Sequence, residues 1–565
     1  MLLLATQDLP AIHDVGSVSA GVVDRVLERE YESRPLGPYQ EAPIINMDVP
    51  KEQLDLCDGE TVFVKSVSFC GNTIFSSSCL ELISEEYCNR DITMGDINRI
   101  CLAVQLFYAD KGYFLALAFP PDQDITDGTL QIEIMEGKLG DIFVIENEFY
   151  SDKFIAGYFE RFKDLPINYH QIIRAILLLN ENADIFTTLI FKKGSRLGTA
   201  DIVLKVEDEW PVQIYEDCNN YGTNQISKWR AGVRLDYGNL FTDGDMLSVT
   251  EVVGREARDL NFTDAIYSVP LNKRGTRLSL SYLNSFFKVR KIADLRLKGK
   301  SEITSLKVGH AITRTKNLRL DGFIAFDYKQ LKNYAVGRTS SFDKLRIGRI
   351  GIYLDKPDPF YGRNIIEAYG SVGCTRFLGG SKAVDELCSR FGSGGRFNYL
   401  TLDVTRIQSL PEGCSLILNS SFQFTGNKLP NAEQIYIGGV DTVRGFPSAL
   451  RLGDKGFYAN FELRFPPPFI GDIKIPCLEV KWREVMQLLG FVDTGRVSYN
   501  GRFFRSKEFK KKSDVSRHST LTGAGVGLRA IGPYGLDFSL DVGFPLNHRR
   551  HVDCVQTYFR ASIHI

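Results

Sequence analysis

The sequence lacks any run of about 18 apolar residues, the length that a helix needs to cross a membrane. Its apolar clusters, such as residues 175–179, are far shorter. This absence excludes a helical membrane protein. A membrane β-barrel stays open, because barrel strands are short and alternate between apolar and polar residues, so that hydropathy hardly registers them.

An excess of charge of either sign is also missing. Lys and Arg together number 68 and Asp and Glu 69, so the formal net charge is -1. A nucleic-acid-binding protein would show a strong basic excess, and we therefore expect no nucleic-acid partner. The first five residues are apolar without any basic residue, so they are either the remnant of a signal peptide or simply a start.

Metal-binding patterns are absent from the cysteines. The sequence has 11 of them, but no Cys-x-x-Cys pair and no zinc-ligand spacing with histidine, so no metal is expected. Five lie between Cys57 and Cys101, and some of these could pair in an oxidising compartment, although the connectivity cannot be deduced. Those of the second half are expected to be small buried hydrophobic residues.

Catalytic motifs are few. Residues 491–495, Phe-Val-Asp-Thr-Gly, match an aspartic-protease signature, but that chemistry needs two carboxylates sharing a proton and the sequence has one Asp-Thr-Gly only. Arg496 also stands where a small hydroxyl residue is expected. The glycines at 523, 525 and 527 form no dinucleotide fingerprint, because no βαβ unit surrounds them. No Gly-x-x-x-x-Gly-Lys-Ser/Thr and no His-Glu-x-x-His occurs, so we expect neither an enzyme nor a cofactor.

The N-terminal segment, residues 1–35, contains an amphipathic helix predicted over residues 19–31 with Ser19 as its cap. Residues 36–59 are polar and contain proline, which is typical of an extended linker. A lone helix on a linker cannot bury an apolar stripe by itself and needs a docking site elsewhere. The stripe consists of Val22, Val23, Val26 and Leu27.

Two consecutive regions, residues 60–137 and 138–208, follow one α+β plan in the order β-α-α-β-β. In the first region, strands are predicted at 61–69, 113–119 and 129–135 and helices at 76–87 and 94–111. In the second region, strands are predicted at 140–145, 187–193 and 199–206 and helices at 151–162 and 168–180.

Residues 209–565 consist of short alternating segments separated by turn residues. In the clearest segment, residues 534–543, every second side chain is apolar and the intervening ones include Asp537, Ser539 and Asp541. This pattern is typical of a lipid-embedded barrel with a wet lumen, although a soluble sandwich also alternates. The region is long for one sandwich and ends on a strand whose open edge barrel closure would remove, so we favour the barrel.

A glycine-rich loop around residues 427–457 interrupts these strands. It carries the tetrapeptide Val443, Arg444, Gly445 and Phe446. Long loops are usually functional or disordered, and Gly445 lets the backbone turn sharply beside a single arginine.

Further motifs follow one another in a fixed order. They are Asn-Tyr-Gly at 220–222, Gly-Val-Arg at 232–234, Gly-Asp at 244–245, Val-Arg-Gly-Phe at 443–446, Gly-Phe-Val-Asp-Thr-Gly at 490–495 and Gly-Ala-Gly-Val-Gly-Leu-Arg at 523–529. With this order, the whole chain resembles the TpsB family, the outer-membrane transporters of two-partner secretion that include haemolysin activators and the filamentous-haemagglutinin transporter. The two α+β regions resemble POTRA (polypeptide-transport-associated) domains.

The resemblance implies a membrane β-barrel of about 16 antiparallel strands, preceded by two α+β POTRA domains and an N-terminal helix that plugs the pore. It also implies that the loop folds back into the lumen, where Arg444 meets the inner-wall carboxylate of Asp493. Such an arginine–carboxylate pair is geometrically fixed and could act as a latch. Supporting positions are Gly495, Glu462, Gly525 and Arg529.

The implied function is secretion of an unfolded exoprotein client, a haemolysin, adhesin or toxin, from the periplasm through the barrel. POTRA domains are thought to receive clients by strand addition, here along a sheet edge formed by Thr199, Ile202, Leu204 and Val206. Outer-membrane lipids, the barrel assembly machinery and a monomeric state are expected as well. The alternatives are an assembly factor that inserts other barrels, which would usually carry more POTRA repeats, and a passive pore or adhesin.

Overall fold

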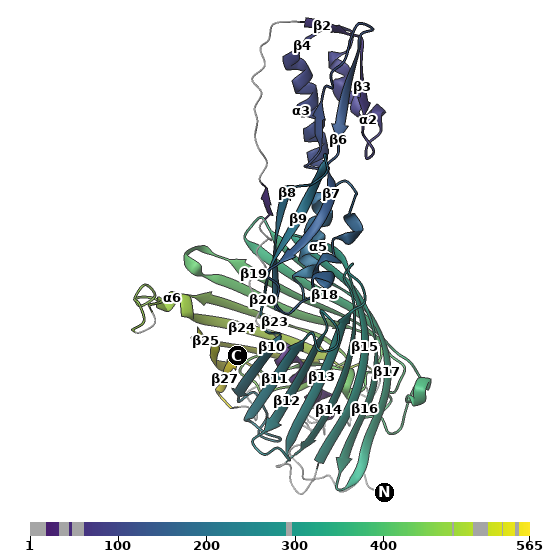
Figure 1. Ribbon diagram of the computed structural model, residues 1–565. Coiled ribbons are helices and arrows are strands. Elements are labelled where there is room, and N and C mark those ends of the chain that lie inside the picture. The colour runs from purple at the N-terminus through teal and green to yellow at the C-terminus, as the bar shows by residue number, and fades with distance from the viewer. Residues whose placement is uncertain are drawn as a thin grey trace. The chain divides into compact units, whose positions relative to one another are not determined.

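The computed structural model describes residues 19–32, 45–47, 61–182, 184–289, 297–476, 479–500, 518–533, 535–547 and 553–564. These residues form two compact units (Figure 1). One unit holds the N-terminal helix and a β-barrel, and the other holds two small α/β domains. Among the described helices, none has both the length and the apolarity needed to span a membrane.

Sixteen strands close into the barrel, and the last, β27, pairs antiparallel with the first, β10 (Figure 1). The predicted number of strands is therefore confirmed. The strands are β10 (Val212–Asn219), β11 (Arg230–Gly238), β12 (Met246–Gly254), β13 (Leu260–Pro270), β14 (Thr276–Lys288), β15 (Leu297–Thr315), β16 (Leu318–Ala335), β17 (Arg338–Asp358), β18 (Gly362–Gly373), β19 (Asn398–Ser409), β20 (Ser415–Phe424), β23 (Lys455–Phe465), β24 (Met486–Ser498), β25 (His518–Ile531), β26 (Leu536–Pro545) and β27 (Gln556–His564).

The barrel wall follows the predicted alternation. Ile350, Val492 and Val526 point outward and are 67%, 50% and 59% exposed. Asp493, the neighbour of Val492 on β24, is 0% exposed and faces the lumen. An apolar outer face and a polar interior are what a strand needs when one side meets lipid and the other does not.

The N-terminal helix α1 (Val22–Glu32) begins three residues after Ser19. The prediction that the Ser19 side chain caps it is wrong, because the Ser19 hydroxyl has no partner among the described residues. Its backbone carbonyl instead accepts from the Val22 amide at 3.1 Å. The Asp24 carboxylate accepts from the Gly21 amide at 3.0 Å and so takes over the capping of the first turn.

The first α/β domain has a three-stranded sheet in the order β3-β6-β5 and a separate β2-β4 pair. The strand predicted over residues 61–69 is two strands, because residues before Lys65 pair with β4 and those after it pair with β6. Strand β4 was not predicted. The elements are β2 (Thr61–Val64), β3 (Ser66–Cys70), α2 (Ser77–Ser84), the 3-10 helix η2 (Glu85–Tyr87), β4 (Arg90–Thr93), α3 (Met94–Asp110), β5 (Leu117–Phe119) and β6 (Thr129–Met135).

The second α/β domain repeats this topology in the sheet order β1-β8-β9-β7. Its first predicted helix is broken at Gly157. The elements are β7 (Lys138–Ile145), α4 (Asp152–Ala156), η3 (Glu160–Phe162), α5 (Tyr169–Leu179), β8 (Ile185–Lys193) and β9 (Thr199–Asp208), together with β1 (Ile45–Met47) from the linker.

The predicted client-binding edge is wrong. Strand β9, which carries Thr199, Ile202, Leu204 and Val206, pairs with β7 on one side and β8 on the other. Its backbone hydrogen bonds are therefore already used, and Ile202, Leu204 and Val206 are fully buried in the domain core. An internal strand of this kind cannot accept another strand.

Nine cysteines lie among the described residues, and all nine are free. The expectation that those of the second half are buried holds only for Cys388. Cys374 and Cys414 are half-buried and Cys554 is exposed, and these three, like Cys388, lie in connecting segments outside the strands.

Candidate functional site: a loop anchored inside the barrel

The connection between β20 and β23 is a long loop, residues 425–454, which we call the lumen loop. It contains η6 (Asn431–Glu433) and a small hairpin of β21 (Ile435–Ile437) and β22 (Arg451–Gly453). Between the two hairpin strands lies the tetrapeptide 443–446. Val443 and Phe446 are fully buried in a cluster with Val497 and Leu521, which belong to β24 and β25 of the barrel wall.

Arg444 is 4% exposed and meets Asp493 through three hydrogen bonds. The guanidinium Nε donates to Asp493 Oδ2 at 2.7 Å and a terminal nitrogen donates to Oδ1 at 3.0 Å. The backbone amide of Arg444 adds a third bond to Oδ2 at 3.0 Å. This bidentate geometry fixes the orientation of both partners. The structure thus brings together the two residues that were predicted to meet.

Two further carboxylates, Glu462 and Asp541, contact the same guanidinium. Arg444 donates to Glu462 Oε2 at 2.8 Å and to Asp541 Oδ2 at 3.4 Å. Arg529 binds Asp541 at 2.6 Å and 2.9 Å, and Arg464 donates to Glu462 at 2.6 Å. Three carboxylates therefore meet three guanidinium groups, which balances the charge that burial would otherwise penalise.

Arg444 lies in a loop, outside the membrane-spanning strands. Burial alone lowers the pKa of its guanidinium, but hydrogen bonding and the charge of Asp493 raise that pKa above its ordinary value. The side chain is therefore a permanent cation.

The Phe491 ring packs against the Arg444 guanidinium, and Gly525 leaves room for that ring. The guanidinium carbon of Arg444 lies 3.5 Å from the centre of the Phe491 ring, within the range of a cation–π contact. Gly525 faces Phe491 on the neighbouring strand, and a Cβ there would lie 2.5 Å from the ring and would also collide with the Val542 carbonyl. Only glycine at 525 leaves the ring room to lie flat beneath Arg444.

The tip of the lumen loop approaches the wall at Gly445. Its φ of +93° is in the region that favours glycine, and a Cβ there would lie 2.9 Å from the backbone of Phe544. Gly495 plays a similar part under Val443, because a Cβ at 495 would lie 3.1 Å from the Val443 methyl group. The Tyr558 hydroxyl accepts from the Gly445 amide at 3.1 Å and donates to the Phe446 carbonyl at 2.7 Å.

The base of the lumen loop is closed by a further carboxylate, Asp454, which is fully buried. It accepts from the Leu429 amide at 2.9 Å and from the Asn500 amide at 2.6 Å. Arg390, from the connection between β18 and β19, forms an ion pair with it. The loop is thus fixed by ion pairs at its tip and at its base.

Helix α1 fills the space between the lumen loop and the opposite wall. Val23 and Leu27 pack into a cluster with wall residues such as Phe262. Val22 and Val26 pack instead against Tyr436 and other residues of the lumen loop. The predicted apolar stripe is therefore divided between two partners. The buried Asp24 carboxylate accepts a hydrogen bond from Ser285 on β14, and the helix is lodged inside the barrel.

Among the site residues that sequence reasoning missed are Asp541, Tyr558 and Arg390. Asp541 lies in a segment whose alternation predicted that its side chain points into the lumen. The alternation did not predict which arginines it would bind. Tyr558 is one of 24 tyrosines and carries no distinguishing motif. Arg390 lies in a connection with no recognised pattern.

The geometry at Asp493 does not match an aspartic-protease site. Both oxygens of Asp493 accept from Arg444, which is the geometry of an ion pair and not of a proton-sharing protease dyad. No cluster of three or more potential metal ligands exists within the part of the chain that the structure describes.

A closed barrel with an apolar outer face, an internal helix and loop, and two preceding β-α-α-β-β domains define an outer-membrane transporter of the POTRA–barrel class. The family model "Haemolysin secretion/activation protein ShlB/FhaC/HecB" matches residues 198–530, more than half of the chain. The chain belongs to this family, as its motifs predicted. A second model, "POTRA domain, ShlB-type", matches residues 62–137.

Curated relatives and solved structures agree with this assignment. The Heme/hemopexin transporter protein HuxB of Haemophilus influenzae is 22% identical over 473 residues, 81% of this chain and 79% of the relative. The outer membrane transporter CdiB of Dickeya dadantii is 21% identical over 523 residues, 89% and 86% of the two chains. The structure of CdiB from Escherichia coli covers 99% of this chain and 100% of its own, with a TM-score of 0.77 and 18% identity.

A further solved structure shares the fold at lower similarity. BamA from Haemophilus ducreyi covers 89% of this chain with a TM-score of 0.54 and 14% identity, which shows a common architecture and nothing about activity. The family match decides between a secretion transporter and an assembly factor that inserts other barrels, and the chain is a secretion transporter. Its barrel lies in the bacterial outer membrane, with the POTRA region in the periplasm.

Proposed function

We propose that the chain binds one unfolded exoprotein in the periplasm and threads it through the barrel lumen without any bond chemistry. Among its relatives are transporters named for haem–hemopexin, haemolysin and the CdiB type, and a client of comparable kind, a haemolysin, adhesin or toxin, is proposed here. The sequence contains no nucleotide-binding loop, so folding of the client outside the cell would supply the driving force.

The observation that carries this proposal is the contrast between the two occupants of the lumen. The lumen loop is held by ion pairs at Arg444 and at Asp454. Helix α1 is held by apolar packing and by hydrogen bonds such as that between Ser285 and Asp24. Removing α1 breaks the hydrogen bonds that Arg25 donates to the Asn431 and Gln434 carbonyls and the contacts of Arg25 and Arg29 with the Tyr436 ring. Moving the loop also separates the buried ion pairs of Arg444 with Asp493 and of Arg390 with Asp454. We therefore infer that α1 is a plug that leaves and that the loop is a latch that stays.

Client capture requires an unpaired strand edge. Strand β8 has nine residues, and among the described residues the linker strand β1 pairs with three of them, Leu189 to Phe191, in a parallel arrangement. A client segment could replace this short occupant with a longer one.

The remaining partners follow from the barrel. Its apolar outer face is suited to outer-membrane lipids, and insertion of such a protein would use the barrel assembly machinery. Closure between β10 and β27 within one chain leaves no open edge for a second copy, which supports a monomer.

Substitution of Arg444 by Ala tests the latch. We expect secretion of the client to stop while the barrel still assembles, because the loop tip loses its bonds to three carboxylates. The readouts are client in the medium and heat-modifiable migration of the barrel on gels. Arg396→Ala, an exposed arginine of another connection, serves as the control. Normal secretion by Arg444→Ala would remove the latch from the mechanism.

A further inference from the structure

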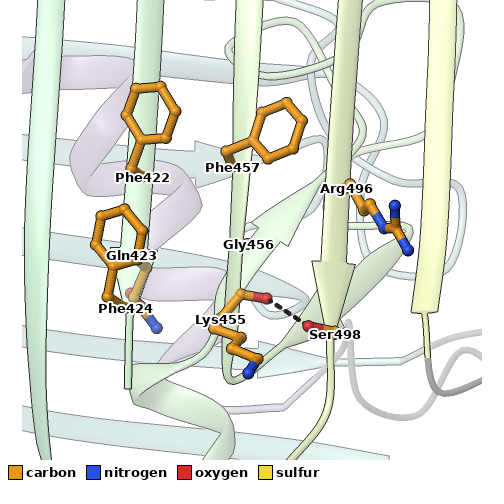
Figure 2. A pocket seen from close by; sticks show the side chains of 8 residues that line it. All are labelled: Phe422, Gln423, Phe424, Lys455, Gly456, Phe457, Arg496 and Ser498. Carbon is orange, nitrogen blue, oxygen red and sulfur yellow. Dashed lines mark hydrogen bonds between the residues drawn. The ribbon is translucent and has the colours of Figure 1, made fainter. Parts of the chain in front are cut away.

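A groove of about 220 Å³ lies on the outer wall of the barrel, across strands β20, β23 and β24 (Figure 2). It is distinct from the lumen site, which faces the opposite side of the same strands. Its walls combine aromatic rings with two cationic side chains, a composition that differs from the purely apolar band of a lipid-facing wall.

The aromatic part consists of Phe422, Phe424 and Phe457. The rings of Phe422 and Phe424 are parallel, with centres 6.4 Å apart, and those of Phe422 and Phe457 lie 6.0 Å apart. Phe424 and Phe457 are 53% and 36% exposed. Such rings offer an apolar surface to acyl chains and are typical of the interfacial girdles of outer-membrane barrels.

The cationic part consists of Lys455 and Arg496, which are both exposed. The strand register places Arg496 directly beside Phe457 and places Lys455 beside Ser498, two residues further along β24. Diagonal neighbours of this kind lie roughly 7–8 Å apart, so both side chains can reach a single anionic group.

Within the described residues of these three strands, no carboxylate shares this surface. The acidic residues of the three strands are Glu462 and Asp493, and both face the lumen, where arginines already pair with them. Within the described parts of the chain, neither Lys455 nor Arg496 forms an ion pair. Two cations without an anion, next to an apolar surface, are complementary to a lipid with a negatively charged headgroup.

The position of the groove along the barrel axis shows which leaflet of the outer membrane it faces. The POTRA region is periplasmic, so β10 begins at the periplasmic face and successive strands alternate in direction. On this count, β20 and β24 end, and β23 begins, at the cell-surface side. Phe424, Lys455 and Ser498 are therefore at the outer rim of the barrel.

We propose that this groove binds a phosphorylated lipid of the outer leaflet, with Arg496 and Lys455 pairing with phosphate and the three phenylalanines contacting acyl chains. Arg would bind phosphate with paired N–H groups and Lys would act as a point charge. The bound lipid contacts the outer side of the two strands that carry Glu462 and Asp493 on their inner side.

The test uses the full chain purified in detergent and bisphosphorylated lipid A as the probe, with occupancy measured by native mass spectrometry. The double variant Lys455→Gln/Arg496→Gln is expected to lose at least tenfold in occupancy. The swap Lys455→Arg/Arg496→Lys is expected to retain the probe, and heat-modifiable migration verifies that each barrel is folded. Lys356→Gln removes an exposed cation at the periplasmic end of β17 and should leave occupancy unchanged.

Two competition arms separate the possible ligands. Dephosphorylated lipid A should bind at least tenfold more weakly, and inorganic phosphate should not displace the probe. Equal occupancy in the double variant, or an equal loss in Lys356→Gln, would overturn the proposal. Full displacement by inorganic phosphate would show a site for free anions instead of a lipid, and equal binding of the dephosphorylated lipid would show that the cations take no part.

Discussion

At Arg444, one guanidinium group reaches Asp493, Glu462 and Asp541 and also lies on the ring of Phe491. Breaking a buried pair of this kind typically costs about 3–5 kcal/mol, because the carboxylate left behind is desolvated and unpaired. Lysine could not restore the arrangement, since a single ammonium group cannot form the two parallel bonds to Asp493. The site therefore depends on this particular side chain.

Gly525 packs against the Phe491 ring, so a substitution at this glycine tests whether the ring supports Arg444. Gly525→Ala should displace the ring, because the added Cβ would collide with it and with the Val542 carbonyl. We expect a loss of about 1–3 kcal/mol in barrel stability, the usual cost of overpacking, together with reduced secretion. Heat-modifiable migration as a function of temperature measures the stability.

A matched control lies on the adjacent strand. A Cβ at Gly490 would meet no atom within 4 Å, so Gly490→Ala should leave stability and secretion unchanged. If the two alanine variants behaved alike, the support of Phe491 by Gly525 would play no part in the site.

Residue motifs predicted one half of this site and not the other. The resemblance of their motifs to the TpsB family predicted that Arg444 meets Asp493, and Gly445 indicated a sharp turn of the backbone beside that arginine. Asp541 contacts a lumen-loop residue that lies 97 positions away in the chain. Tyr558 contacts two lumen-loop residues that lie 112 and 113 positions away. Such contacts are set by strand register around the closed barrel, and no short stretch of sequence encodes them.

At the scale of elements, helix α1 was predictable because its apolar residues recur at helical spacing. Its need for a docking site was also evident. The division of its stripe between the wall and the lumen loop was not, because it depends on two surfaces that are far apart in sequence. The prediction that β9 lies at the edge of its sheet was wrong for a related reason. Periodicity identifies a strand but does not show which strands lie beside it.

Removing the first 50 residues tests the plug directly. The truncated chain lacks α1 and β1, so single-channel conductance in a planar bilayer should rise. Client binding to the periplasmic domains should rise as well, because the β8 edge loses its linker strand.

The double variant Val23→Asp/Leu27→Asp separates these two effects. Two carboxylates in the apolar cluster that these residues occupy should expel the helix, because burying an unpaired charge is costly, while the linker strand is still present. Conductance should rise in this variant too. Unchanged conductance in both variants would contradict the plug.

At the scale of the whole molecule, strand alternation and length predicted the closed barrel, and the repeated β-α-α-β-β order predicted the two preceding domains. A barrel that closes within one chain, holds a helix in its lumen by apolar packing and carries a loop anchored by ion pairs is suited to passing an extended polypeptide. The central claim is that this chain alone provides the route and that no nucleotide is consumed.

The most direct measurement reconstitutes the purified chain in liposomes, adds its unfolded exoprotein client to the outside without nucleotide, and then adds protease. We predict that barrels whose periplasmic domains face outward admit the client, which then becomes protected from digestion inside the vesicles, and that Arg444→Ala vesicles protect none. A client that stays fully digestible although correctly folded wild-type barrels are present would contradict the account.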